Sequence, residues 1–343
     1  MKNRLLGVID ATTYQEELED LMIHRSLGAI PFAGRYRLID FVLSNMVNSD
    51  IESVAIFPKF QYRSLMDHLG SGKNWDLDRK RDGLFFFPSP TLEGTQRNGI
   101  GSFNHFAANL DYFYQSKQEY ALIANCFTVF NMDFRPVLDR HIHSGCDITE
   151  IRQHGKSLEM YLVKTSFLIE LIKSRGATRY TCMYDVVTDL NHPFLICSYE
   201  YEGFAERIDS IQKYYQVSMD LLQPQNWKKL FWQDRPIFTK VKDEPPTKYL
   251  NSAFVQHSMI ANGCQIKGSI ENSIISRGVK IGKGTVIKNC IIMQKSQIAD
   301  NCFLESVIID KDVKVESGTV LTGSSGSPVV IRKGTVQGAL MNS

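Results

Sequence analysis

The sequence lacks an excess of either charge, a long apolar run and a cysteine framework. Lys and Arg total 39 and Asp and Glu total 37, a net charge of +2, so we expect no surface for nucleic acid or acidic membranes. No segment approaches the ~18 apolar residues of a membrane span, and the N-terminal apolar run is too short for a signal peptide. The seven cysteines form no C-x-x-C pair, so we expect reduced thiols in a cytoplasmic protein.

The N-terminal two-thirds has the pattern of an α/β layer. Residues 5–9, 53–57 and 120–124 are apolar runs typical of buried parallel strands, whereas 37–47 and 136–143 have helical character. Strands that alternate with helices predict a doubly wound sheet of the Rossmann-like kind.

The C-terminal third carries an internal repeat. Aromatic residues become rare after about residue 258, and apolar residues recur six apart in rows offset by 17 residues. A helix cannot place one residue in six on a common face, but a three-sided coil of short parallel strands can. The alternative is an ordinary β-sandwich with chance spacing. We therefore predict a parallel β-helix, left-handed as is usual for hexapeptide repeats, with these residues pointing inward: Ile275, Ile281, Ile287, Ile292, Ile298, Leu304, Ile309, Val315 and Leu321.

A chain of 343 residues is long enough for about two domains. Four prolines among polar residues mark a linker between them. The predicted organisation is an α/β domain over 1–222, a linker over 223–250 and a β-helix over 251–343.

Several segments together resemble the glucose-1-phosphate adenylyltransferase family. Residues 30–41 read IPFAGRYRLIDF, which is similar to the family signature PFGGKYRIIDF, and 61–65, 75–79 and 219–222 match further family segments. The resemblance covers essentially the whole chain. It implies a nucleotidyltransferase domain followed by a left-handed β-helix, and the formation of ADP-glucose and pyrophosphate from ATP and glucose 1-phosphate.

The chain departs from this family where the chemistry is expected. A glycine-rich triphosphate loop should follow the first strand, but no glycine occurs between Gly7 and Gly28. Leu27 stands where the family has a phosphate-facing Lys, and Phe127 and Arg207 stand at the positions of two Asp residues that hold Mg²⁺. The sugar-binding EKP stretch has no counterpart between Ile148 and Tyr161. We therefore predict no catalytic residue, no metal site and no cofactor in this chain.

Some positions of the family's substrate pocket keep polar or small residues. Gly101 and Ser102 take the place of a Gly-Thr pair near the nucleotide, and Ser157 matches a Ser that contacts the sugar. The resemblance implies that these residues are the remnant of a substrate pocket.

The pattern of losses resembles the non-catalytic, GlgD-type subunit of the family. It implies a regulatory partner of a catalytic, Mg²⁺-dependent subunit in a heterotetramer that serves glycogen biosynthesis. One alternative is a weakly active adenylyltransferase in which Glu206 or Asp209 holds the metal after a register shift. Another is a hexapeptide acyltransferase or bare scaffold, although His257 is the only histidine beyond residue 200.

Basic residues near the degenerate segments are candidates for an effector site. In the family, sugar phosphates or inorganic phosphate are held between the two domains by cations, and Arg offers bidentate contacts to phosphate. Ordinary surface charges are the alternative. The candidates lie in two groups far apart in sequence, which we expect to meet: His24, Arg25, Arg35 and Arg37, and Arg332 and Lys333.

Overall fold

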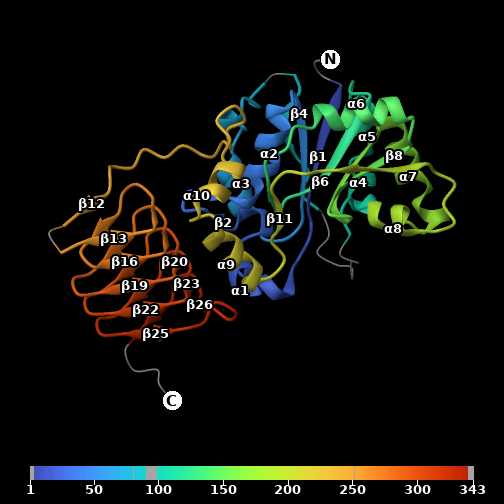
Figure 1. The fold of residues 1–343 in the computed structure, drawn as a ribbon. Helices are drawn as coiled ribbons and strands as arrows, with labels where there is room; N and C mark the ends of the chain where they lie inside the picture. The colour runs from blue at the N-terminus through green and yellow to red at the C-terminus, as the bar shows by residue number, and fades with distance from the viewer. Residues whose placement is uncertain (1–3, 80, 90–98, 251, 339–343) are drawn as a thin grey trace.

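A computed structural model describes residues 4–79, 81–89, 99–250 and 252–338. It has two modules, an α/β layer followed by a solenoid of short strands (Figure 1). Within these residues, no helix has both the length and the apolar character needed to cross a bilayer.

The α/β module is built on a seven-stranded sheet with the order β10-β8-β9-β6-β1-β4-β5. Strand β1 pairs in parallel with β4 and β6, whereas β9 is antiparallel to β6 and β8. The sequence-based strands at 5–9, 53–57 and 120–124 are confirmed as β1, β4 and β6, which are fully buried. The strands of this sheet are β1 (Leu5–Ala11), β4 (Ser53–Pro58), β5 (Gly83–Phe86), β6 (Tyr120–Asn125), β8 (Ile148–Gln153), β9 (Lys156–Lys164) and β10 (Ile196–Glu200).

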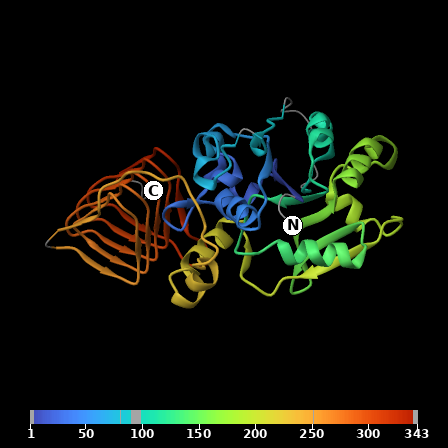
Figure 2. The ribbon, with the colours of Figure 1, turned by 90° about the horizontal axis from the view of Figure 1, so that it is seen from above.

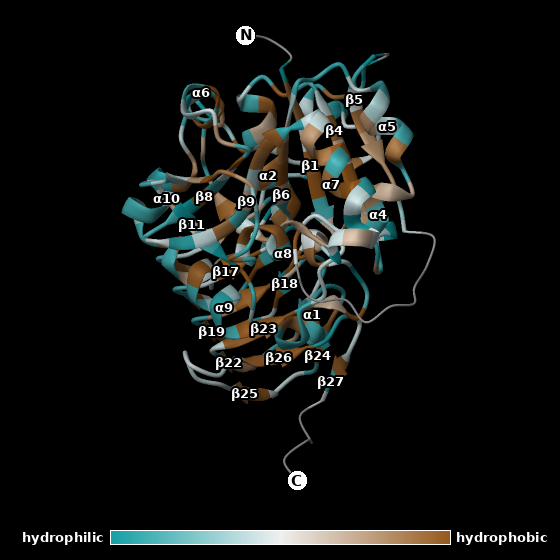
Figure 3. Ribbon diagram, turned by 90° about the vertical axis from the view of Figure 1, so that its right-hand side faces the viewer, coloured by the Kyte–Doolittle hydropathy of each residue, from teal (hydrophilic) through white to brown (hydrophobic). Residues whose placement is uncertain are grey.

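Helices and short two-stranded sheets complete this module. Hydrophobic residues line β1, β4 and β6, while α10 carries mostly hydrophilic ones (Figure 3). The predicted helices at 37–47 and 136–143 are confirmed as α2 and α6. The remaining elements are η1 (Glu16–Leu18), α1 (Glu19–Met22), η2 (Leu27–Ala29), β2 (Pro31–Phe32), β3 (Tyr36–Arg37), α2 (Leu38–Asn48), α3 (Arg63–Leu69), η3 (Lys73–Trp75), α4 (Phe103–Ala107), α5 (Leu110–Gln115), β7 (Thr128–Phe130), α6 (Arg135–Ser144), α7 (Thr165–Thr178), α8 (Met183–Thr188), β11 (Ala205–Arg207), α9 (Ile211–Asp220) and α10 (Pro224–Leu230).

The C-terminal module is the predicted left-handed parallel β-helix, with three parallel sheets that form its sides. Its strands are β12 (Lys248–Tyr249), β15 (Gln265–Ile266), β18 (Lys280–Ile281), β21 (Gln297–Ile298), β24 (Lys314–Val315) and β27 (Val336–Gln337) on one side; β13 (Phe254–Gln256), β16 (Ser269–Glu271), β19 (Val286–Lys288), β22 (Phe303–Glu305) and β25 (Val320–Thr322) on the second; β14 (Met259–Ile260), β17 (Ile274–Ile275), β20 (Ile291–Ile292), β23 (Val307–Ile309) and β26 (Val329–Ile331) on the third.

The 17-residue spacing of apolar residues in the sequence matches the pairing of strands between successive coils. Ile275 pairs with Ile292, Ile281 with Ile298, and the same step recurs along the coils. Eight of the nine predicted positions are buried, whereas Leu321 is only partly buried on β25, the last strand of its side. Helix α10 and strand β12 lie inside the stretch 223–250 that the sequence predicts as a linker.

The hydrophobic core of the α/β module extends onto the β-helix, whereas the interior of the coils forms a second cluster of its own. Ile291, Met293 and Ile308 of the β-helix belong to the same cluster of buried side chains as the strands of the α/β sheet. Helix α9 lies between the modules (Figure 2), and its Tyr215 hydroxyl donates to the Asn289 carbonyl oxygen at 2.7 Å.

The signature segment 30–41 also builds this boundary. Gly34 has a φ of +74°, and a Cβ built there would lie 3.8 Å from Ile274 and the Ile275 carbonyl oxygen of the β-helix. The space would admit a Cβ, but a side chain would be strained by the left-handed backbone, so the conformation of this turn favours glycine. On the neighbouring strand, the Pro31 carbonyl oxygen accepts a hydrogen bond from Tyr214 of α9 at 2.7 Å.

The cysteine prediction is wrong for one pair. Cys146 and Cys197 form a disulfide, with their Cα atoms 6.0 Å apart, within the usual range for such a bond. The pairing arises because β10 lies beside β8 in the sheet, an adjacency that cysteine spacing does not reveal. The other five cysteines are free and buried.

Candidate functional site

The first candidate site lies at the carboxyl ends of β1 and β6, where α/β sheets of this kind bind ligands. Asp10 is the last residue but one of β1, which is buried throughout, and Asp10 is itself fully buried. One oxygen accepts from the backbone N–H groups of Gly101 and Ser102, at 2.7 and 3.1 Å. The other oxygen accepts from the Thr12 N–H at 2.8 Å and the Thr12 hydroxyl at 2.6 Å. An internal carboxylate thus occupies the two N–H groups that were predicted to lie near a nucleotide.

The segment that should carry a phosphate loop is folded differently. Residues 16–22 form the short helices η1 and α1, whose carboxylates lie mostly at the surface. Leu27 is 1% exposed and belongs to the hydrophobic core. Its side chain therefore offers neither charge nor access to a phosphate group.

The two positions predicted to have lost a metal carboxylate lie together. The guanidinium carbon of Arg207 lies 5.5 Å from the centre of the Phe127 ring, a cation–π contact. Phe127 is fully buried after β6, where the Asn125 side-chain oxygen accepts from the Phe127 and Thr128 N–H groups. Because β7 and β11 pair antiparallel, Arg207 is opposite Thr128, one residue from Phe127.

Glu159 of β9 completes this group. Its carboxylate forms an ion pair with Arg207 at 3.1 Å, and its backbone has a left-handed φ of 53°. Burial raises the pKa of Glu159, although Arg207 acts in the opposite direction. The Ser157 hydroxyl, predicted to contact a sugar, accepts a hydrogen bond from the Glu159 N–H at 3.0 Å. A non-glycine residue held at positive φ is costly, and the packed ion pair is a reason for its persistence.

These residues do not fit a divalent cation. A Mg²⁺ site needs hard oxygen ligands, but one expected position is an aromatic ring and the other is a cation that already pairs with the neighbouring carboxylate. Glu206, an alternative ligand, instead pairs with Lys213. Within the part of the chain that the structure describes, no group of three His, Cys, Asp or Glu side chains is placed to hold a metal ion.

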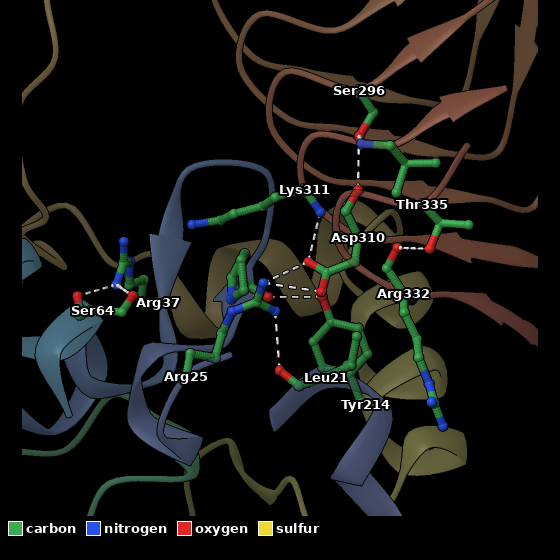
Figure 4. Close-up of polar contacts among 12 residues, drawn as sticks. Leu21, Arg25, Arg37, Ser64, Tyr214, Ser296, Asp310, Lys311, Arg332 and Thr335 are labelled. Atoms are coloured by element: carbon green, nitrogen blue, oxygen red, sulfur yellow. Dashed lines mark hydrogen bonds and ion pairs between the residues drawn. The ribbon is translucent and has the colours of Figure 1, made fainter. Parts of the chain in front are cut away.

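The second candidate site lies at the boundary between the modules (Figure 4). Arg25 is 2% exposed and donates to both carboxylate oxygens of Asp310 in the β-helix, at 2.8 and 3.0 Å. It also donates to the Leu21 carbonyl oxygen at 3.1 Å. Arg25 is therefore a fully paired structural cation.

Five cations near this ion pair, each close enough to act electrostatically on another, form what we call the boundary cluster: Arg35, Arg37, Lys242, Arg277 and Lys311. Burial and the nearby Arg37 and Arg25 lower the pKa of Lys311 to about 7. Burial, with a smaller contribution from Arg25, lowers the pKa of Arg37 to about 10.

Two further members of the boundary cluster, Lys242 and Arg277, show the same effect. Partial burial and Arg277 lower the pKa of Lys242, and burial and Arg35 lower that of Arg277. Cations that depress one another's pKa in this way mark a place where a bound anion would be stabilised.

The structure brings together only part of the predicted effector set. Arg35 and Arg37 lie in the boundary cluster, where Arg37 donates to the Ser64 carbonyl oxygen at 2.6 Å. Arg332 points away from Lys311 and pairs with Asp20 near the surface, and His24 and Lys333 are exposed.

Sequence reasoning missed the other members of the boundary cluster, which are Lys242, Arg277 and Lys311. They come from separate parts of the chain, and no spacing in the sequence connects them. Lys311 follows the inward-facing Ile309 by two positions, so the lattice could have placed it at a corner of a coil but not beside Arg37.

Two family models match parts of the chain. Residues 16–157 match the nucleotidyl transferase model, and residues 245–325 match the GlmU-like C-terminal hexapeptide model. These matches agree with the two modules of the structure.

Similar proteins span the full length of the chain. It is 56% identical over 341 residues to the glycogen biosynthesis protein GlgD of Bacillus subtilis (strain 168), with 99% of each chain covered. It is 60% identical to a protein with the same description from Geobacillus stearothermophilus, with 100% of both covered. The glucose-1-phosphate adenylyltransferase of Bacillus cereus (strain Q1) is 27% identical over 358 residues, covering 93% of this chain and 95% of that protein.

Proposed function

Since the chain belongs to the GlgD family of glycogen biosynthesis proteins, we propose that it serves glycogen synthesis as a non-catalytic, regulatory subunit. Its partner in this proposal is a catalytic glucose-1-phosphate adenylyltransferase, which supplies the Mg²⁺ chemistry. The two chains form a cytoplasmic hetero-oligomer, in which this one alters the partner's rate or its response to effectors.

The observation that carries the proposal is the contact between Arg207 and Phe127. Phosphoryl transfer relies on positioned charge, above all on metal ions that neutralise the phosphate oxygens. Here the expected carboxylate positions are replaced by a ring and a guanidinium that satisfy each other. Loss of the metal would lower the rate on the order of a thousandfold or more.

An assay of the purified chain tests the catalytic half of the proposal. With ATP, Mg²⁺ and glucose 1-phosphate, in both reaction directions, we expect little or no turnover. Turnover in the ordinary range of ~1–100 s⁻¹ would support the rival view that the chain is an adenylyltransferase in its own right.

Mixing experiments test the regulatory half. We expect this chain and a catalytic subunit to elute together from a sizing column, and the mixture to differ from the catalytic subunit alone in turnover or in activation by fructose 1,6-bisphosphate. If the chains elute separately and the partner's kinetics do not change, the regulatory role is wrong.

The boundary cluster is the proposed effector site, with a sugar phosphate or inorganic phosphate as ligand. An anion shifts the assembly only if one conformation holds it more tightly, and the cluster meets that condition if its cations lie closer together in one state of the assembly. Arg277→Gln should reduce activation of the mixed assembly but still allow the chains to assemble. Lys333→Gln changes an exposed residue and is the control, which should leave activation unchanged. Equal activation in both variants would place the effector elsewhere.

A further inference from the structure

A separate cleft of about 500 Å³ lies beside strand β11. Ala205 and Glu206 of this strand line the cleft, whereas Arg207 contacts Phe127 and does not line it. The turn between β8 and β9, the segment that follows β10, and helices α9 and α10 form its walls. Its size is ordinary for a small-molecule site.

A buried polar atom at this cleft has no partner. Asn131 lines the cleft and is 3% exposed, and its amide nitrogen donates to the carbonyl oxygens of Leu230 at 2.8 Å and Arg235 at 3.0 Å. These bonds fix the side-chain amide, and its oxygen has no hydrogen-bond partner among the described residues. This oxygen is itself closed to solvent. A small movement of the cleft wall would expose it, and an unpaired buried acceptor favours a ligand that donates a hydrogen bond.

Aromatic groups stand beside this acceptor. Trp232 lines the cleft with 52% of its surface exposed, and its indole N–H donates to Asp234 at 3.0 Å, which holds the ring in place. The Tyr201 hydroxyl donates to the backbone carbonyl oxygen of Asn131 at 2.7 Å, which fixes the orientation of the Tyr201 ring. An exposed aromatic face beside planar polar groups suits a ligand with one apolar face and a rim of hydroxyls.

The charges of the cleft nearly balance. Three carboxylates, those of Glu202, Glu206 and Asp220, line it with the cations Lys229 and Arg235, and Glu206 pairs with Lys213. Burial, together with Glu206, raises the pKa of Asp220. The cleft therefore offers no net positive charge to a phosphate group, whereas the hydroxyls of a neutral ligand can donate to its carboxylates.

We propose that this cleft binds glucosyl units of a neutral α-glucan chain. A pyranose ring has an apolar face that can stack on Trp232 and hydroxyls that can donate to the exposed carboxylates of Glu202 and Asp220. The relatives' description as glycogen biosynthesis proteins selects glucose among hexoses. Such a site would hold the chain, and any subunit bound to it, on the growing polymer. The proposal does not depend on the regulatory role, because it concerns a different face of the module.

Native gel electrophoresis with and without glycogen tests the proposal, followed by calorimetry with maltoheptaose. The wild-type chain should be retarded by glycogen and bind maltoheptaose. Trp232→Ala and Asp220→Asn should each weaken binding by about tenfold or more. Tyr114→Ala removes an equally exposed aromatic ring outside the cleft, so it should bind as the wild type does.

Three results would overturn the proposal. They are the absence of glucan binding by the wild-type chain, unchanged binding in both cleft variants, and binding of glucose 1-phosphate but not maltoheptaose in a Trp232-dependent way. Thermal melting of each variant identifies any that fails to fold. Asp220→Asn changes an exposed carboxylate at the end of α9, so it keeps the test decisive if Trp232→Ala is unstable.

Discussion

Arg207 lies over the Phe127 ring and pairs with Glu159, so the chain's own cation fills the place where two carboxylates were expected. The substitutions at these positions compensate each other, because the guanidinium gains both a ring and a carboxylate partner. The site is a packed element of the protein and no longer an open metal pocket.

Arg207→Ala should destabilise the chain by about 1–3 kcal/mol at pH 7, because it leaves the Glu159 carboxylate buried without a partner. The pKa of Glu159 is already raised by burial and should rise further in the variant. An acid with a raised folded-state pKa loses stability as the pH rises through that pKa, so the deficit should grow with pH. In acid, where Glu159 is protonated, only the loss of the Phe127 contact should remain. Urea unfolding between pH 4 and 8 measures this, and Arg207→Ala/Glu159→Gln should restore stability at pH 7.

Arg25→Met should cost about 3–5 kcal/mol of unfolding free energy, since it strands the buried Asp310 carboxylate. Both side chains of this pair are 2% exposed. The double variant Arg25→Met/Asp310→Leu should recover most of the loss. Arg332→Ala breaks the exposed pair with Asp20 and serves as the control, with an expected cost below ~1 kcal/mol. Similar losses in Arg25→Met and Arg332→Ala would contradict the assignment.

Anion binding at the boundary cluster should strengthen as the pH falls through about 7, the pKa of Lys311. Lys311 is charged below this pH and neutral above it, so the cluster carries one more positive charge in acid. Sulfate is the suitable probe, because it does not titrate in this range. Calorimetry at pH 6 and pH 8 should show tighter binding at pH 6, and Lys311→Gln should remove the difference. An unchanged pH dependence in Lys311→Gln would assign the titration to another group.

Ile298→Asp should unfold or disassemble the protein, because an unpaired carboxylate inside a coil is unfavourable by several kcal/mol. Ile298 is 2% exposed and pairs with Ile281 and Val315 in the inward ladder. The neighbouring Gln297 is exposed on the same strand, so Gln297→Asp is a matched control that should melt normally. Equal melting temperatures for the two variants would show that the inward ladder is not the source of stability.

Reduction of the Cys146–Cys197 disulfide should lower the unfolding free energy by about 2–4 kcal/mol, because the link closes a long loop in the unfolded chain. Thermal melting with and without dithiothreitol measures the change. Cys146→Ser/Cys197→Ser should be insensitive to the reductant. If the wild type is equally insensitive, the two cysteines are not joined in solution.

The repeat made the β-helix predictable from the sequence alone. The spacing of its apolar residues can be read directly from the sequence. The same 17-residue step separates hydrogen-bonded residues, such as Cys290, whose N–H donates to the Ser273 hydroxyl. The buried strands β1, β4 and β6 were predictable for a similar reason, because parallel strands covered on both faces are continuously apolar.

The sites were predictable only in part. The departures at Phe127 and Arg207 were visible in the sequence, but their mutual contact depends on the pairing of β7 with β11. No feature of the sequence indicated a role for Glu159, because its ion pair joins β9 to β11, which belong to different sheets. Lys311 lies near Arg37 only because the β-helix packs against the α/β module. The same packing brings Asp310 to Arg25.

Ile291, Met293 and Ile308 of the β-helix pack in the core of the α/β module. The two modules are therefore joined by packed side chains and not only by the segment that connects them. Close-packed interiors have low compressibility and transmit strain. We therefore expect a displacement of the outer coils to move the α/β module with them. A subunit that binds the β-helix would then also fix the orientation of the α/β module.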